Sequence, residues 1–186
     1  MSIISHHTIS LDGYIAGRED SMDWAFAHGR PTSLAGQTID RLGAILAGRR
    51  WYELAEARWD GVDGIYGGGF EGTVFVLTHD PPGGEAHPRV RFLADGIHAA
   101  VARAQAAAGE QDVGVFGASL TRQCLRAGLL DELVLHLVPV LLGGGVRLFG
   151  EGESEPIKLE RLSVGQGRQL TDLRFRVVKR PGRDSA

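Results

Sequence analysis

Small residues lie directly between apolar segments and helical patterns in this sequence, and such an arrangement can bind anions. Residues 113–133 read VGVFGASLTRQCLRAGLLDEL, where an apolar segment meets Gly117, Ala118 and Ser119 and a helical pattern follows at once. A helix that opens directly after a strand points unpaired N–H groups and partial positive charge beyond the end of that strand. Two explanations fit these residues: close packing of the helix on the strand, or a diphosphate lying against the backbone.

Two arginines repeat this arrangement earlier in the chain. Residues 44–53 read AILAGRRWYE, so that a buried strand ends at a glycine and a helix begins with Arg49 and Arg50. Positive side chains at the start of a helix oppose its dipole, and a nearby anion would relieve that conflict. In the alternative explanation both guanidinium groups are solvated or pair with Glu53 or Glu56.

A third apolar segment also ends in polar residues. Residues 74–82 read VFVLTHDPP, with Thr78 and His79 directly after the predicted strand. In open α/β sheets, ligands bind in the crevice outside the carboxyl ends of the strands. We therefore expect these three strand ends to converge on one crevice.

His136 is a candidate for substrate contact. It lies within the apolar segment ELVLHLVPVLL, residues 132–142, where a buried polar group needs a partner. Because side chains alternate along a strand, His136 shares a face with Val134 and Val138. It is either a core histidine bonded to its neighbours or a side chain that faces a pocket.

Asp12 and Trp24 are further candidates with ordinary alternatives. Asp12 precedes Gly13, so it is either a turn residue or a proton donor. Trp24 lies in a predicted loop, 18–32, and is either part of the core or a lid that stacks on a planar ligand.

Composition and missing motifs exclude several classes of function. The net charge is −3 without a long basic run, which disfavours nucleic-acid binding. The GxSxG motif of serine hydrolases is absent. The HExxH motif is also absent, Cys124 is the only cysteine, and His6 and His7 point to opposite faces of a strand, so no metal site is expected. No signal peptide and no membrane span are visible, and we expect a cytoplasmic protein with no membrane partner.

The order of elements predicts an α/β fold with a mostly parallel sheet and an antiparallel C-terminal edge. We expect one domain, residues 1–180, and a frayed tail, 181–186. Gly61 to Gly72 is expected to be a flexible loop, and the last two strands form a hairpin around residues 165–167. Strands are predicted at 2–9, 44–47, 73–78, 90–93, 113–116, 132–142, 157–164 and 170–179, and helices from Ser33, at 49–57, between 97 and 108, and at 120–128.

Six segments in this order resemble the dihydrofolate reductase-like superfamily, and most closely its riboflavin-biosynthesis reductase branch of the C-terminal-domain type. The resemblance covers residues 2 to 179 and rests on SLDGYIAG, DSMDW, AILAGRRWYE, VFVLT, VFGASLTRQCLRAGLLDEL and VPVLLGGGVRLF. It implies a twisted, mostly parallel sheet of about eight strands with flanking helices. It also implies an NADPH-dependent reductase that transfers a hydride to a small heterocyclic or imine-like substrate, such as a pterin or a ribosylaminopyrimidine, and that forms a homodimer.

The resemblance further implies a role for each matched position. The residues implied to hold the adenosine phosphates and the diphosphate are Gly48, Arg49, Arg50, Trp51, Leu77, Thr78, Gly117, Ala118, Ser119 and Leu120. The residues implied on the nicotinamide and substrate side are Ile15, Ala16 and Trp24, with Asp12 and His136 as candidates for the chemistry.

Two positions depart from the family pattern. Phe116 stands where riboflavin-pathway reductases usually carry a glutamate that binds substrate. The stretch GRPTSLAGQ, residues 29–37, offers no acidic residue of the kind that assists protonation in dihydrofolate reductases. These departures leave a second hypothesis open, a non-catalytic protein that binds a dinucleotide or senses a ligand on the same fold.

Overall fold

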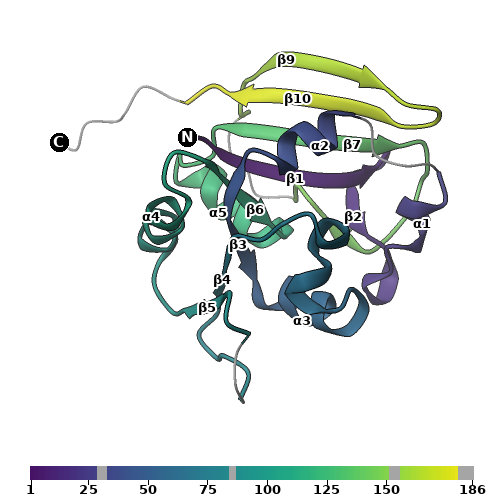
Figure 1. Cartoon of the computed structure of the whole chain (residues 1–186). Helices are drawn as coiled ribbons and strands as arrows, with labels where there is room; N and C mark the ends of the chain where they lie inside the picture. Colours follow the sequence, from purple (N-terminus) through teal and green to yellow (C-terminus); the bar gives the residue numbers. More distant parts are fainter. Residues whose placement is uncertain (29–32, 84–86, 151–155, 180–186) are drawn as a thin grey trace.

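The centre of the molecule is one sheet of eight strands (Figure 1). The computed structural model describes residues 1–28, 33–83, 87–150 and 156–179. From one edge to the other the strands are β5 (Val90–Leu93), β4 (Thr73–Leu77), β3 (Leu42–Gly48), β6 (Asp112–Phe116), β1 (Ile3–Ser10), β7 (Glu132–Val138), β10 (Thr171–Val177) and β9 (Leu159–Gln166). The first six strands pair in parallel, and β10 pairs antiparallel with both β7 and β9, which confirms the predicted fold class.

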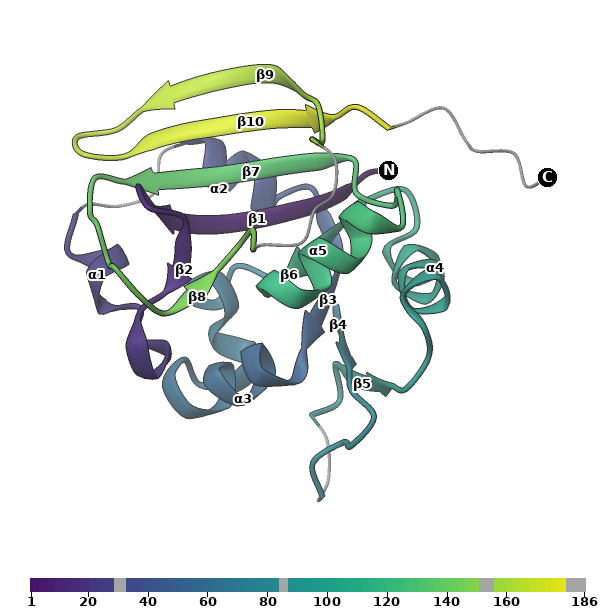
Figure 2. The ribbon, with the colours of Figure 1, turned by 180° about the vertical axis from the view of Figure 1, so that it is seen from behind.

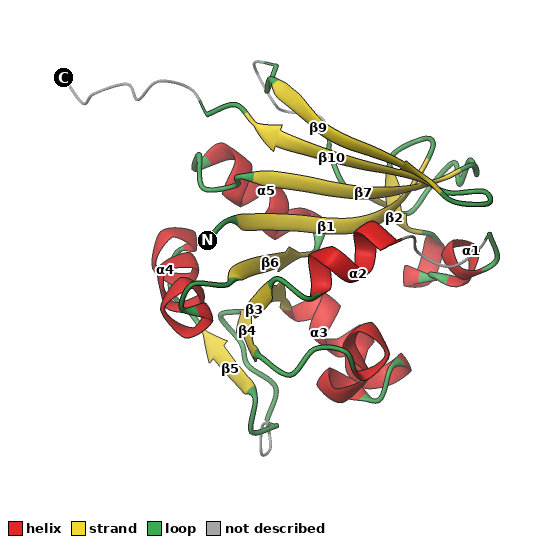
Figure 3. Ribbon diagram, turned by 45° about the horizontal axis from the view of Figure 1, so that its top comes forward, coloured by secondary structure: helices red, strands yellow, loops and turns green. Residues whose placement is uncertain are grey.

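Helices cover both faces of the sheet, as Figures 1 and 2 show from opposite sides and Figure 3 shows with the top tilted forward. Strands covered on both faces read as continuous apolar segments, and every residue of β6 is buried. One face carries α2 (Ser33–Ile39), α3 (Arg49–Arg58) and the 3-10 helix η2 (Gly61–Gly68). The other face carries α4 (Ile97–Ala108) and α5 (Ala118–Arg126).

A short two-stranded ribbon lies apart from the main sheet and was not predicted. Its strands are β2 (Tyr14–Ala16) and β8 (Val146–Arg147), and η1 (Arg18–Asp20) and α1 (Asp23–Phe26) follow β2. A side chain at Gly145 would collide with the carbonyl of Ala16, so glycine is needed for the approach of the two strands. This close approach is a tertiary contact that local patterning does not reveal.

Two predicted segments need correction. The strand predicted at 132–142 ends at Val138, because Pro139 has no N–H to donate to the sheet. The segment predicted as a loop from Gly61 to Gly72 begins with helix η2, whose Val62 and Ile65 are buried in the core.

The C-terminal hairpin is confirmed, but its turn lies later than predicted. Gly167 N–H donates to the carbonyl of Leu170, so the turn spans 167–170 rather than 165–167. The predicted tail, 181–186, lies outside the described residues. In the part of the chain that the structure describes, every helix is too short or too polar to cross a bilayer.

Candidate functional site

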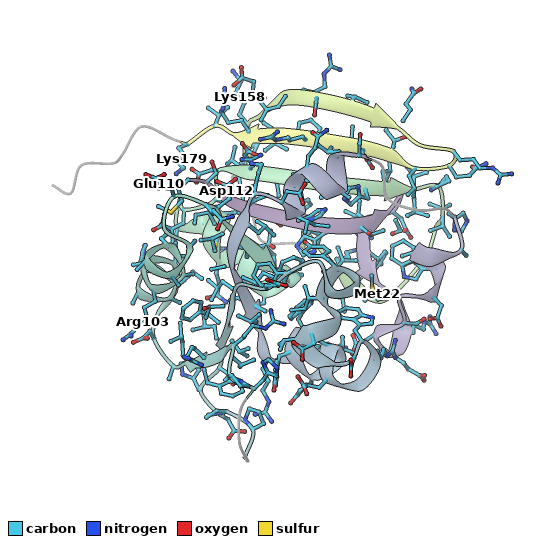
Figure 4. All side chains as sticks on the ribbon, viewed as in Figure 1. Met22, Arg103, Glu110, Asp112, Lys158 and Lys179 are labelled. Atoms are coloured by element: carbon cyan, nitrogen blue, oxygen red, sulfur yellow. The ribbon has the colours of Figure 1, made fainter. Side chains whose placement is uncertain are left out.

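A pocket of about 1080 Å³ lies where β3 and β6 end. Its size is at the upper end of the range for small-molecule sites, which suits an extended ligand. Met22 at the pocket and Asp112 at the amino end of β6 lie far apart in Figure 4, with the strands between them. The residues predicted to form the site that do line it are Ile15, Ala16, Gly48, Arg50, Trp51, Gly117, Ala118, Ser119, Leu120 and His136.

Two helices begin at the pocket without a side-chain cap. Gly48 precedes α3 and Gly117 precedes α5, both glycines line the pocket, and neither helix has a capping hydrogen bond from a side chain. The first N–H groups of an α-helix lack intrahelical partners and favour anions. The pocket therefore has two helix starts that can bind phosphate groups.

The surroundings of Gly117 distinguish between close packing on the strand and approach of a diphosphate, the two explanations for a glycine at this position. Its φ angle is 93°, a conformation that residues with a Cβ rarely adopt, and a Cβ at this position would meet no atom within 4 Å. Close packing on the strand therefore does not explain this glycine. The open space beside a helix N-terminus is where a diphosphate could approach the backbone.

The two arginines of α3 have different surroundings. Arg50 and Asp20 both line the pocket and form a bidentate ion pair, with Nε to Oδ2 at 2.8 Å and Nη2 to Oδ1 at 2.5 Å. Arg49 does not line the pocket. Its guanidinium pairs with Glu53 at 2.7 Å, as the alternative explanation held, and with Asp80 at 2.6 Å.

Aromatic rings form one wall of the pocket. Trp51 and Phe116 have centroids 5.1 Å apart at 35°, and Trp59 contacts Trp51 edge-on at 6.0 Å. Tyr66 packs on Phe116 at 5.9 Å. Such a wall offers flat apolar surface for a planar ring. Phe116, which departs from the family pattern, is thus a wall residue here.

His136 belongs to a chain of buried hydrogen bonds beside this wall. Its Nδ1 lies 2.7 Å from Oδ1 of Asp172, and its Nε2 lies 2.6 Å from Nε2 of His6. The Nδ1 of His6 lies 2.7 Å from the hydroxyl of Tyr66. His136, His6 and Tyr66 line the pocket, whereas Asp172 is fully buried behind them.

Sheet register brings three of these residues together, and η2 supplies the fourth. His136 on β7 is paired with Asp172 on β10 and with Thr8 on β1, and His6 shares the face of Thr8. Tyr66 reaches this face from η2. Sequence reasoning missed Tyr66, His6 and Asp172 as site residues, because only the strand order and the packing of η2 on the sheet reveal that they are neighbours.

Two other buried reactive groups, His7 and the Cys124 thiol, do not belong to this hydrogen-bond chain, although His7 also lines the pocket. His7 bonds Thr121 of α5 at 3.2 Å, and burial together with the charge of His136 lowers its pKa to about 4. Burial raises the pKa of the Cys124 thiol to about 12, so this thiol stays protonated. Among the described residues, no group of three or more His, Cys, Asp or Glu side chains is placed to hold a metal ion.

Several predicted residues lie outside the pocket lining. Trp24 lies in the short helix α1 rather than in the predicted loop, and it donates its Nε1–H to the carbonyl of Ser21 at 3.1 Å. Thr78 forms a local turn with Asp80, donating to its carbonyl at 3.1 Å. Leu77 ends β4 and packs against the core, so neither it nor Thr78 lines the pocket.

Asp12 has the contacts of a tether between two loops. Its carboxylate accepts hydrogen bonds from Ser10 Oγ at 2.7 Å, from Gly143 N–H at 2.8 Å and from Leu142 N–H at 3.1 Å. The Ser10 hydroxyl and the two backbone N–H groups lower the pKa of Asp12 to about 2. An ionised carboxylate outside the pocket lining has no proton to donate near neutral pH, so this geometry favours the turn explanation.

We expect Asp12→Ala to lower stability in a pH-dependent manner. Because the pKa is lowered on folding from 3.8 to about 2, the carboxylate stabilises the fold above pH 3.8 and stops doing so as the pH falls to about 2. The melting-temperature difference between the wild type and Asp12→Ala should therefore be present at neutral pH and shrink across this window. A difference that does not change with pH would contradict the tether.

This mostly parallel sheet with an antiparallel edge is a dihydrofolate reductase-like fold. The RibD C-terminal domain family model matches residues 1–170, and the chain belongs to that family. A relative, the uncharacterized protein YwjB of Bacillus subtilis strain 168, is 26% identical over 168 residues. The match covers 90% of this chain and 92% of YwjB.

Solved structures with this fold include reductases. A Shewanella sp. PV-4 protein assigned to riboflavin biosynthesis has a TM-score of 0.81 at 24% identity, covering 96% of this chain and 100% of its own. The Thermotoga maritima diaminohydroxyphosphoribosylaminopyrimidine deaminase/5-amino-6-(5-phosphoribosylamino)uracil reductase has a TM-score of 0.66 at 16% identity. The match covers 95% of this chain and 56% of that protein. Enterococcus faecalis dihydrofolate reductase, complexed with NADP(H), has a TM-score of 0.63 at 13% identity. The match covers 95% of this chain and 96% of that protein. At these identities the likeness establishes the fold.

Proposed function

We propose that this protein is an NADPH-dependent reductase that transfers a hydride to a small heterocyclic or imine-like substrate of the pterin or ribosylaminopyrimidine class. The observation that carries the proposal is the pocket at the ends of β3 and β6, where two helices begin uncapped. Family membership and an NADP(H)-bound reductase with the same fold support it.

The residues present fit a dinucleotide phosphate. The open space at Gly117 admits a diphosphate to the N–H groups that start α5. Arg50 can bind a phosphate monoester with two parallel hydrogen bonds, as it now binds the carboxylate of Asp20. The rings of Trp51 and Phe116 provide a surface for a planar ring system.

In this proposal the protein binds, orients and excludes water, while the bound cofactor supplies the hydride. The helix starts of α3 and α5 hold the phosphates in place. The aromatic wall and Ile15 displace water from the ring that reacts. Binding of both reactants in one pocket makes their encounter effectively intramolecular.

Phe116 favours the second candidate, a non-catalytic protein that binds a dinucleotide or senses a ligand. Its ring occupies a wall position from which a carboxylate could bind a polar substrate. The two candidates differ in turnover but not in dinucleotide binding. If the protein is a sensor, it binds NADPH but does not consume it when a substrate of this class is added.

Tryptophan fluorescence tests the shared part of both candidates. Two of the three tryptophans, Trp51 and Trp59, line the pocket. We expect NADPH to quench their emission saturably, and Trp51→Phe to remove part of the quenching. Trp24→Phe serves as the matched control, because Trp24 does not line the pocket. Absence of saturable quenching would contradict a dinucleotide site.

Turnover then separates the two candidates. NADPH absorbance is followed with 7,8-dihydrofolate and with the ribosylaminopyrimidine phosphate of riboflavin biosynthesis as trial substrates. Consumption that depends on the substrate supports the reductase, whereas saturable binding with no consumption supports the sensor.

The proposal extends to the setting of the protein: a small-molecule substrate, no nucleic-acid or membrane partner, a cytoplasmic location and a homodimer. The edge strand β9 supports the dimer, because it exposes Leu159, Leu162 and Val164. Exposed apolar side chains on an edge strand are typical of a surface that pairs with another chain.

A further inference from the structure

A chain of hydrogen bonds runs from the interior of the sheet to the pocket. It begins at Asp172 on β10, passes through His136 on β7 and His6 on β1, and ends at the hydroxyl of Tyr66 in η2. Each of its three links is between 2.6 and 2.7 Å. The chain thus joins a fully buried carboxylate to a phenol that lines the pocket.

Hydrogen-bond chemistry fixes the direction of the link to Asp172, and the protonation state of His136 then sets the direction of the other two links. A carboxylate only accepts, so His136 donates its Nδ1–H to Asp172. When His136 is neutral, its Nε2 accepts from His6 Nε2–H, and His6 Nδ1 then accepts from the Tyr66 hydroxyl. When His136 carries a second proton, its Nε2–H donates to His6, His6 donates its Nδ1–H to Tyr66, and the Tyr66 O–H is released toward the pocket.

We propose that this chain is a proton relay and that Tyr66 is the catalytic residue that protonates the substrate nitrogen during reduction. This inference rests on the proposed reductase function. It supplies a proton donor that neither Asp12 nor the segment 29–37 provides.

The relay balances the reaction. Reduction of a carbon–nitrogen double bond adds a hydride to carbon and a proton to nitrogen. As the nitrogen takes the proton, the Tyr66 O–H bond breaks and a substrate N–H bond forms. His6 gives its Nδ1 proton to the Tyr66 oxygen and receives the Nε2 proton of His136 on its own Nε2. His136 ends neutral, still donating to Asp172, and solvent in the pocket returns its second proton.

The environment suits each residue to its part. Burial, with the charges of His136 and His7, lowers the pKa of His6 well below its ordinary value, so His6 passes a proton without storing a charge. Burial raises the pKa of Tyr66 well above its ordinary value, so the phenol does not remain ionised. Asp172 accepts the Nδ1–H of His136, so the second proton of His136 is carried on Nε2, which faces His6. His136, His6 and Asp172 are therefore positioning residues that act through Tyr66.

Nitrogen-15 NMR of the histidine rings tests the relay without substrate or cofactor. Among the described residues, the titratable side chains that interact with His136 are Asp172 from β10 and His6 and His7 from β1. We expect neutral His136 to carry its proton on Nδ1 and His6 to carry its proton on Nε2. Protonation of His136 should switch His6 to its Nδ1–H form while His6 stays neutral. A His6 tautomer that does not follow His136 would overturn the relay.

Kinetics test the terminal donor, with 7,8-dihydrofolate as the substrate probe. We expect Tyr66→Phe to lower kcat about 100-fold with little change in KM for NADPH, since general acids contribute about 10²- to 10⁴-fold. Tyr52→Phe is the matched control, because Tyr52 is buried in the same apolar cluster but does not line the pocket. A Tyr66→Phe enzyme with unchanged kcat would overturn the proposal, as would an equal loss in Tyr52→Phe.

The outcomes separate this inference from the reductase function. If NADPH neither quenches tryptophan emission nor is consumed, the reductase fails, and the histidine spectra alone decide whether the four residues form a coupled chain. If wild-type turnover is present and the two histidines titrate independently, the relay fails and the reductase stands. If Tyr66→Phe lowers the melting temperature but leaves kcat unchanged, the hydrogen-bond chain contributes to stability and not to proton transfer.

Discussion

Gly117→Ala is expected to weaken NADPH binding about 100-fold while the protein still folds. The added methyl group would enter the open space beside the N–H groups that start α5, where the diphosphate is proposed to lie. A factor of 100 corresponds to about 2.7 kcal/mol, the size expected when charged hydrogen bonds are pushed out of reach. Isothermal titration of NADPH into the folded variant measures the loss.

Backbone strain at Gly117 needs its own control. Its φ of 93° and ψ of 139° disfavour alanine, at a cost of about 1–3 kcal/mol in stability. Gly109 ends α4 with φ of 63° and ψ of −118°, and a Cβ at this position would also meet no atom within 4 Å. Gly109→Ala should therefore lose similar stability and keep NADPH affinity. Equal affinity losses in both variants would mean that strain, not contact with the diphosphate, controls binding.

The fold could be predicted from sequence because its strands carry their own signals. Continuous apolar segments such as 113–116 indicated strands buried on both faces, and the buried stripe of α4 was visible at helical spacing. The β2–β8 ribbon could not be predicted, since β8 has only two residues and depends on the approach of Gly145 to Ala16. Its stability comes from tertiary contact, which has no local pattern.

The site residues, like the strands, could be predicted only where a local sequence pattern marks them. Positions next to strand ends, such as Gly48 and Gly117, could be predicted to line a crevice, because parallel strands end at one edge. The hydrogen-bond chain could not be predicted, because His6 and Asp172 are 166 positions apart and both reach His136 only through the register of β1, β7 and β10. The alternation of side chains along a strand predicted which residues share a face with His136, but its hydrogen-bond partners could be identified only from the order of the strands in the sheet.

The pair of arginines shows how side-chain contacts decide between neighbours. Both were predicted to bind the adenosine phosphates, and the sequence offers no means of ranking them. The structure places Arg50 at the pocket with its side chain 68% exposed, while Arg49 pairs with two carboxylates outside the pocket lining. We therefore expect the preference for NADPH over NADH to depend on Arg50.

Arg50→Ala is expected to weaken NADPH binding about 10- to 100-fold and NADH binding far less. In the proposed complex the Arg50 guanidinium bonds the additional phosphate of NADPH in place of Asp20, and such charged hydrogen bonds contribute about 1.5–3 kcal/mol. The variant also leaves the carboxylate of Asp20 at the pocket without its cation, which repels a phosphate. Titration of each dinucleotide into the variant measures both effects.

Arg49→Ala is the matched control, since it removes the same charge one residue away and outside the pocket lining. We expect it to change the affinity for NADPH less than about threefold at physiological salt, because exposed charges are strongly screened. Raising the salt concentration should narrow the difference between the wild type and Arg50→Ala, as expected for an ionic contact. If Arg50→Ala weakens NADPH and NADH equally, the residue contacts a part that both dinucleotides share. If Arg49→Ala has the larger effect, the phosphate lies on the Asp80 side of α3, outside the pocket.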